Sequence, residues 1–194
     1  LVSFLGTRQL GPEGLTVFDM AQKINKQFPE IPKSDFISAA GPYEGFLFPD
    51  TYIFQPSATA ASIVAKMQST FADKTSGIGP DIAASGRTLS EIITMASIIE
   101  REARTDADRR MISGVLWNRI DKGMPLQVDA VFGYIYSRQT YSPSYADLGV
   151  DSPYNTYTHK GLPPGPICSP GLSSIEAALH PTKTKFLFYL TGRE

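Results

Sequence analysis

Two helices with clear start signals occupy residues 88–123 and restrict the folds open to this chain. Thr88-Leu-Ser-Glu91 is a capping box, which predicts a helix that continues to about Arg104. Thr105 is placed to cap a second helix, which Gly123 is suited to end because glycine takes the left-handed conformation that often follows a helix. Both helices carry apolar stripes and therefore need partners that bury them.

Weaker signals on either side predict shorter elements. Thr16 is placed to cap an amphipathic helix, and Ser34 is the expected cap of a second short one. Strand-like residues occur in 44–54 and in 186–190, while 73–86 is typical of a loop. Further helices are expected at 59–71 and 172–179. Together these elements predict an α+β fold in which helices pack around a small sheet.

Composition excludes several classes of function. The formal net charge is -1, without the basic stripe that a nucleic-acid-binding protein needs. Cys168 is the single cysteine, which rules out an internal disulfide and a cysteine-based zinc site. His159 and His180 lie far apart in the sequence, so we expect no metal ion.

The chain contains no stretch typical of a membrane span. Its longest helix-like apolar run, 92–99, is far below the ~20 residues that a bilayer requires. The chain starts at Leu1 and ends after a strand-like run. Both ends are typical of cuts in a longer protein, so the missing span says little about whether that protein has an anchor.

Glu100 is the unusual residue of the 89–104 helix. At about 100° per residue it falls within the apolar stripe that runs through Ala96 and Ala103, whereas Glu102 is expected on the opposite side. Burial disfavours the charged form of a carboxyl group, and a carboxyl that stays protonated can give a proton to a glycosidic oxygen and take one back. The alternative is a structural glutamate paired with an arginine.

Aromatic and turn residues are suited to a sugar-binding groove. Aromatic rings can cover the apolar faces of sugars, although many aromatic side chains simply pack in the core. Gln127, Asp129 and Asn155 lie in turn-rich segments where polar side chains can face a ligand, or can hydrogen-bond the local backbone instead. The candidate aromatic residues are Phe46, Phe48, Tyr52, Tyr134, Tyr141, Tyr154 and Tyr157.

Five motifs in order resemble the MltG/YceG-type endolytic murein transglycosylases. The likeness covers about residues 41–190, and the segment before it resembles the tail of a LysM-like domain. The motifs are Glu44-Gly-Phe-Leu-Phe-Pro-Asp-Thr-Tyr52, Ala96-Ser-Ile-Ile-Glu-Arg-Glu102, Asn118-Arg-Ile with Gly123-Met-Pro-Leu-Gln127 and Asp129, Tyr154-Asn-Thr-Tyr157, and Gly161-Leu-Pro-Pro-Gly-Pro166.

The resemblance implies non-hydrolytic cleavage of MurNAc–GlcNAc bonds in peptidoglycan, leaving 1,6-anhydroMurNAc ends. The first Glu of the second motif, Glu100, would be the catalytic acid–base. Gln127, Asp129, Tyr154, Asn155 and Glu44 would bind substrate, and no cofactor is needed.

The resemblance also implies an organisation and a setting. Residues 1–40 would be part of a LysM-like subdomain, and 41–194 a YceG-like catalytic domain that lacks its C-terminal end. The protein would act at the extracytoplasmic face of the bacterial plasma membrane, held by an N-terminal anchor outside this chain. Peptidoglycan glycan strands would be its substrate, and peptidoglycan synthases (penicillin-binding proteins) its partners. One departure from the family pattern is Ala130, where a proline usually follows the aspartate.

Two other functions remain open. A non-catalytic peptidoglycan-binding or scaffold module would bind glycan without making anhydro ends. A pyridoxal-phosphate-dependent lyase would require a Schiff-base lysine, and the only lysines near the motifs, Lys122 and Lys160, occupy connecting positions.

Overall fold

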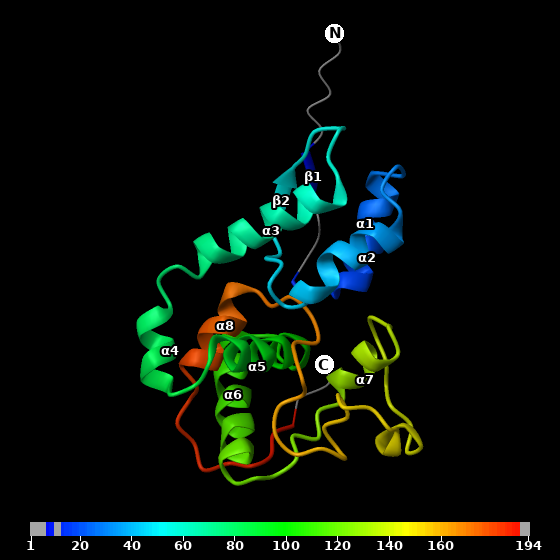
Figure 1. Cartoon of the computed structure of the whole chain (residues 1–194). Helices are drawn as coiled ribbons and strands as arrows, with labels where there is room; N and C mark the ends of the chain where they lie inside the picture. The colour runs from blue at the N-terminus through cyan, green and yellow to red at the C-terminus, as the bar shows by residue number, and fades with distance from the viewer. Residues whose placement is uncertain (1–6, 10–12, 191–194) are drawn as a thin grey trace.

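The computed structural model describes residues 7–9 and 13–190, and this part of the chain is mostly helical (Figure 1). Helices α1 to α3 and a pair of short strands form the upper part of Figure 1, and α4 to α8 the lower part. In chain order the elements are β1 (Thr7–Gln9), α1 (Val17–Gln27), α2 (Lys33–Ala40), the 3-10 turn η1 (Gly41–Tyr43), β2 (Thr51–Ile53), α3 (Ala60–Lys74), α4 (Gly79–Ser85), α5 (Leu89–Glu102), α6 (Asp106–Asp121), α7 (Ala130–Ile135), η2 (Asp147–Gly149) and α8 (Leu172–Leu179).

Threonine capping boxes start four of these helices. The hydroxyls of Thr16, Thr59, Thr88 and Thr105 each accept a hydrogen bond from the backbone N–H three residues later. Such caps satisfy N–H groups that have no partner inside the helix. The predicted starts of α5 and α6 are therefore confirmed, as is the end of α6, where Gly123 takes a φ of 64°.

Buried apolar side chains form two clusters. The first joins α1, α2 and α3 and includes Ile24, Phe36 and Met67. The second is built around α5, α6 and α8 and includes Ile98 and Leu116. The first cluster contains residues on both sides of position 40. The domain boundary expected at that position remains a prediction.

The helical part of the predicted fold is confirmed, but in the part of the chain that the structure describes the sheet is too small for helices to pack around it. The only sheet within those residues is the antiparallel pair β1 and β2, three residues each, with residue 8 opposite Tyr52. The predicted strand at 186–190 is also not formed, since no described segment offers it a ladder of backbone partners. Helices pack mainly on one another, with α5 against both α6 and α8.

Three local predictions are also wrong. The predicted loop 73–86 contains α4, which begins with Gly79 and Pro80, and proline is well tolerated in a first helical turn. Helix α2 starts one residue before Ser34, which makes no capping bond. Within 44–54, only Thr51–Ile53 is a strand.

The N-terminal segment is joined to the second cluster by backbone hydrogen bonds. Gly14 N–H donates to the Ser169 carbonyl (3.0 Å), and Ser169 N–H donates to the Leu15 carbonyl (2.9 Å). Residues 13–15 are therefore fixed beside the last turn of α5. None of the helices in the described ranges is long and apolar enough to cross a membrane.

Glu44 links the start of α1 to the following loop. Its Oε2 accepts a hydrogen bond from Val17 N–H at 3.0 Å. Burial raises the pKa of Glu44 to about 7, although the backbone hydrogen bonds oppose this shift. Its charged form is therefore costly to the folded state at neutral pH.

We expect Glu44→Gln to gain stability relative to the wild type as pH rises. A carboxyl whose pKa is raised by folding binds more protons in the folded state, so it loses stability between its ordinary pKa and about 7. Gln keeps the acceptor for Val17 and does not ionise. Urea unfolding at pH 5 and pH 8 should therefore show a difference that moves by about 2–3 kcal/mol in favour of Gln. A difference that does not change with pH would contradict this account.

Gly114 lets α6 approach the segment after α8. A Cβ at this position would collide with the Thr182 carbonyl oxygen. We predict that Gly114→Ala lowers the free energy of unfolding by about 1–3 kcal/mol, despite the better helix propensity of alanine. Gly77→Ala is the control, since nothing lies within 4 Å of its Cβ. Equal urea midpoints for the two variants would refute the close approach.

Candidate active site

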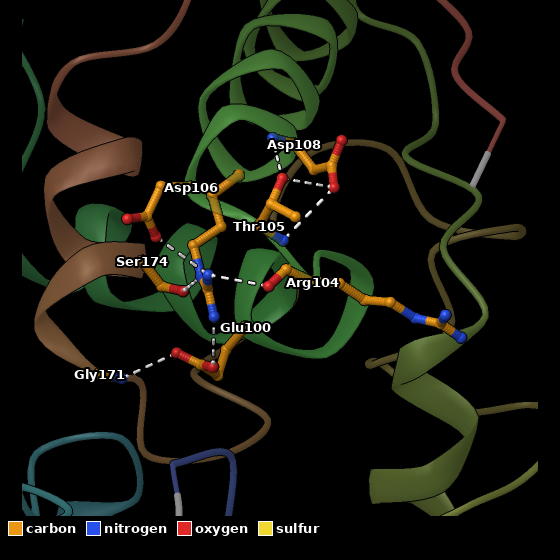
Figure 2. A network of polar contacts seen from close by, with 8 residues as sticks. Glu100, Arg104, Thr105, Asp106, Asp108, Gly171 and Ser174 are labelled. Atoms are coloured by element: carbon orange, nitrogen blue, oxygen red, sulfur yellow. Dashed lines mark hydrogen bonds and ion pairs between the residues drawn. The ribbon is translucent and has the colours of Figure 1, made fainter. Parts of the chain in front are cut away.

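Glu100 lies in the last turn of α5 and faces the junction of α5, α6 and α8. Its side chain is only 7% exposed. Oε2 accepts a hydrogen bond from Gly171 N–H at 2.9 Å, and Oε1 lies 3.5 Å from Arg109 Nη2 (Figure 2). Gly171 is the N-cap of α8, and the N-terminal end of a helix favours a carboxylate. The sequence-based placement of Glu100 on a buried face agrees with this geometry.

Arg109 is held by three groups besides Glu100. Its Nη1 lies 3.1 Å from Asp106 and 3.4 Å from the Arg104 carbonyl, and its Nε donates to the Ser174 hydroxyl at 3.1 Å. These contacts use several of the donors of the guanidinium group and fix its plane. Arg109 is therefore a rigid neighbour of Glu100, contributed by α6.

Glu100 lines a groove of about 640 Å³. A neighbouring hollow of about 380 Å³ shares Glu102 and Asp129 with it. These two carboxylates thus line both hollows. The groove is lined by Glu13, Gly14, Glu100, Arg101, Glu102, Arg104, Asp129, Ala130, Gly133, Gln139, Thr140, Tyr141 and Ser142.

Glu102 was expected on the side of α5 opposite the apolar stripe, and segments distant in the sequence cover that side and enclose Glu102 in the groove. Its Oε1 accepts from Ala130 N–H at 3.3 Å, and its Oε2 accepts from the Tyr189 hydroxyl at 3.1 Å. Burial, together with the charge of Asp129, raises the pKa of Glu102 above its ordinary value. Periodicity along α5 could not find this residue, because the segments that cover it are distant in the sequence.

Ala130, which stands where the family pattern usually has a proline, contributes its backbone N–H to the groove. A proline at this position would have no N–H, so it could not donate to Glu102 as Ala130 does. The replacement thus adds a hydrogen bond to a groove carboxylate. Asp129, just before it, accepts a hydrogen bond from the Tyr157 hydroxyl at 2.6 Å. Burial raises the pKa of Tyr157 most, and the contact with Asp129 raises it further.

Gln127 lies in the hollow next to the groove. Its φ of 52° is in the left-handed region, which is uncommon for a residue with a side chain. Its side-chain oxygen accepts from Arg119 Nη2 at 2.7 Å. Arg119 is buried, so this contact fixes the direction of the Gln127 amide.

The other three predicted site residues do not line these hollows. Asn155 is fully buried, and its Nδ2 donates to the carbonyls of Leu148 (3.1 Å) and Val150 (2.9 Å). Tyr154 packs against Tyr134 with ring centroids 4.8 Å apart. Glu44 binds the start of α1, as described above. Their predicted contacts with substrate stay predictions.

The described residues do not form a cluster of side chains suited to bind a metal ion. Within them, no group of three or more His, Cys, Asp and Glu side chains is arranged to hold an ion. The buried Cys168 thiol donates to the Ser97 carbonyl, and burial raises its pKa well above the ordinary value. A thiol in this state is a poor nucleophile.

Comparison with known proteins finds relatives that are each named endolytic murein transglycosylase. An endolytic murein transglycosylase of Bacillus subtilis (strain 168) is 39% identical over 171 residues, which are 87% of this chain and 48% of the relative. The protein of that name from Streptococcus pneumoniae serotype 2 is 36% identical over 152 residues, 76% of this chain and 28% of the relative. The chain therefore spans about half of the first relative and just over a quarter of the second.

A solved structure and a family model agree with these relatives. The crystal structure of a putative YceG-like protein from Listeria monocytogenes superimposes with a TM-score of 0.88 at 34% identity, covering 96% of this chain and 71% of that one. The model of the YceG-like family matches residues 8–194. The chain belongs to the YceG-like family.

Proposed function

We propose that this chain carries the catalytic groove of an endolytic murein transglycosylase that cleaves MurNAc–GlcNAc bonds in peptidoglycan glycan strands. The observation that carries the proposal is the position of Glu100, a nearly buried carboxyl at the wall of a groove, held by Gly171 and Arg109. The names of the Bacillus and Streptococcus relatives support the same activity.

A single carboxyl is sufficient for the proposed reaction. Glu100 gives its proton to the glycosidic oxygen as the bond to C1 of MurNAc breaks. The C6 hydroxyl of the same sugar then attacks C1, and its proton passes to Glu100. The glutamate is thereby restored, no water is consumed, and the product is a 1,6-anhydroMurNAc end. This differs from a two-carboxylate glycosidase, in which water or a second carboxylate attacks the anomeric carbon.

Asp129, Glu102 and Gln127 are the proposed substrate contacts beside Glu100. Asp129 and Glu102 line both hollows, so they are placed to bind hydroxyls or to stabilise positive charge near the anomeric carbon. Gln127 offers an amide whose direction Arg119 fixes. Of the predicted substrate-binding residues, Asp129 and Gln127 therefore have the best geometric support.

A non-catalytic glycan-binding module is the second candidate function. The observation in its favour is the contact of Glu100 with Arg109 at 3.5 Å, which a purely structural ion pair would also make. Such a module would use the groove to bind glycan and would generate no anhydro ends. The activity of the Glu100 variant separates the two candidates.

The cellular setting is also a proposal. We propose an extracytoplasmic location with a single N-terminal membrane anchor outside this chain, and peptidoglycan synthases as partners. The N-terminal 40 residues would belong to a LysM-like subdomain that helps to hold the strand. The names of the relatives support the extracytoplasmic location, because murein lies outside the plasma membrane.

Glu100→Gln should abolish the release of anhydro-muropeptides from isolated sacculi. Gln keeps the shape of Glu100 and an acceptor for Gly171, but it has no proton to give. We expect a loss of at least about 100-fold, in line with the contribution of general acid–base catalysis. Mass spectrometry of the digested sacculi measures the internal anhydro ends.

Glu176→Gln is the matched control for this measurement. Glu176 lies on the exposed side of α8, and its replacement makes the same change of charge. We expect wild-type activity from it. Wild-type levels of anhydro ends from Glu100→Gln would rule out the proposed mechanism, and no anhydro ends from the wild-type chain would favour the binding module.

A further inference from the structure

Two arginines that line the groove form no ion pair with any carboxylate of the described residues. Arg101 lies in the last turn of α5, and Arg104 follows the end of that helix. The Arg101 guanidinium donates to two neutral acceptors, the carbonyls of Gly14 (3.2 Å) and Gln139. Its positive charge is therefore not neutralised by a carboxylate at contact distance.

Arg104 combines a fixed backbone with an uncommitted side chain. It stands between Ala103, the C-cap of α5, and Thr105, whose capping box starts α6. Its carbonyl accepts from Arg109 Nη1 at 3.4 Å. Figure 2 shows its side chain extended and directed away from Glu100. Within the ranges that the structure describes, its guanidinium has neither a hydrogen-bond acceptor nor an ion-pair partner.

The lining of the groove indicates which ligand would suit this guanidinium. An arginine presents planar N–H donors that bind a carboxylate through two parallel hydrogen bonds. The same groove is lined by residues 139–142, whose side chains are polar and uncharged and so suit hydrogen bonds to amide groups. A ligand that offers both a carboxylate and amides is a peptide.

The acids of the groove do not block such a contact. Glu102 and Asp129 also line the neighbouring hollow, which Arg104 does not reach. Glu100 is paired with Arg109. Burial and the charge of Glu100 raise the pKa of Glu13, the fourth acid, and this shift disfavours its charged form.

We propose that Arg104 is a specificity residue that binds a carboxylate carried by the lactyl substituent of MurNAc, with the charge of Arg101 adding to the attraction. This inference rests on the proposed function of the groove. In peptidoglycan the lactyl group carries a short stem peptide with free carboxylates. Where the peptide has been removed, the lactyl group itself ends in a carboxylate.

This contact would set the register of the glycan strand. MurNAc and GlcNAc alternate along the strand, and only MurNAc has a lactyl substituent. An arginine that binds this substituent selects the register in which the MurNAc unit, rather than GlcNAc, presents its C1 to Glu100. Arg104 thus acts through binding, and Glu100 through proton transfer.

Isothermal titration calorimetry with defined fragments tests the proposal. The chain carries Glu100→Gln, so that bound fragments are not cleaved. The probes are a peptidoglycan tetrasaccharide with stem peptides, the same fragment with its carboxylates amidated, and a tetrasaccharide without peptides. Arg104→Gln should weaken the binding of a fragment with the recognised carboxylate about 5- to 10-fold, as expected for one charge-assisted contact near solvent. It should leave the binding of the amidated fragment unchanged.

Two further variants serve as controls. Arg104→Lys should bind with intermediate affinity, because lysine keeps the charge but not the two parallel donors. Arg110→Gln makes the same change of charge at an exposed position of α6 that does not line the groove, and it should bind like its parent.

The pattern of losses decides the outcome. A loss confined to the peptide-bearing fragment identifies a stem-peptide carboxylate as the ligand, and a loss confined to the peptide-free fragment identifies the lactyl carboxylate; either result upholds the proposal. An equal loss on the amidated fragment, or no loss or no binding with both carboxylate fragments, would overturn it. A chain that binds as expected but makes no anhydro ends on sacculi in its Glu100 form would uphold this contact and reject only the proposed activity.

Discussion

The Glu100 carboxyl, held between the Gly171 N–H and the Arg109 guanidinium, is the interaction on which the site depends. It requires three helices to meet: the last turn of α5 supplies Glu100, α6 supplies Arg109, and the N-terminal end of α8 supplies the amide. A nearly buried carboxyl needs such partners, because an unpaired buried charge is costly. The packing of α5 against α6 and α8 therefore serves both the core and the groove.

Local chemistry explains why part of this fold was predictable. The capping boxes of α5 and α6 depend on residues three apart, and the left-handed Gly123 ends α6 within a few residues of its last turn. Glu100 could be recognised because it interrupts an apolar stripe. Its partners Gly171 and Arg109 could not, since their approach depends on tertiary packing.

The errors have physical causes as well. Glu102 was assigned to the outer face of α5, but α7 and the Tyr189 segment cover that face. Asn155 and Glu44 hydrogen-bond backbone groups, and their expected contacts with substrate stay predictions. A polar side chain in a turn has the same sequence pattern whether it faces a ligand or its own backbone. The 186–190 segment is a run of aromatic residues and leucines typical of a strand, but residue type alone supplies no neighbouring strand.

A crystal structure of the Glu100→Gln variant with a bound peptidoglycan tetrasaccharide tests the central claim most directly. The account predicts that the strand lies along the groove past Glu102 and Asp129. It also predicts that the glycosidic oxygen between MurNAc and GlcNAc lies within about 3 Å of the side chain at position 100. A strand bound outside the groove, or a glycosidic oxygen beside Glu102 and out of reach of position 100, would contradict it.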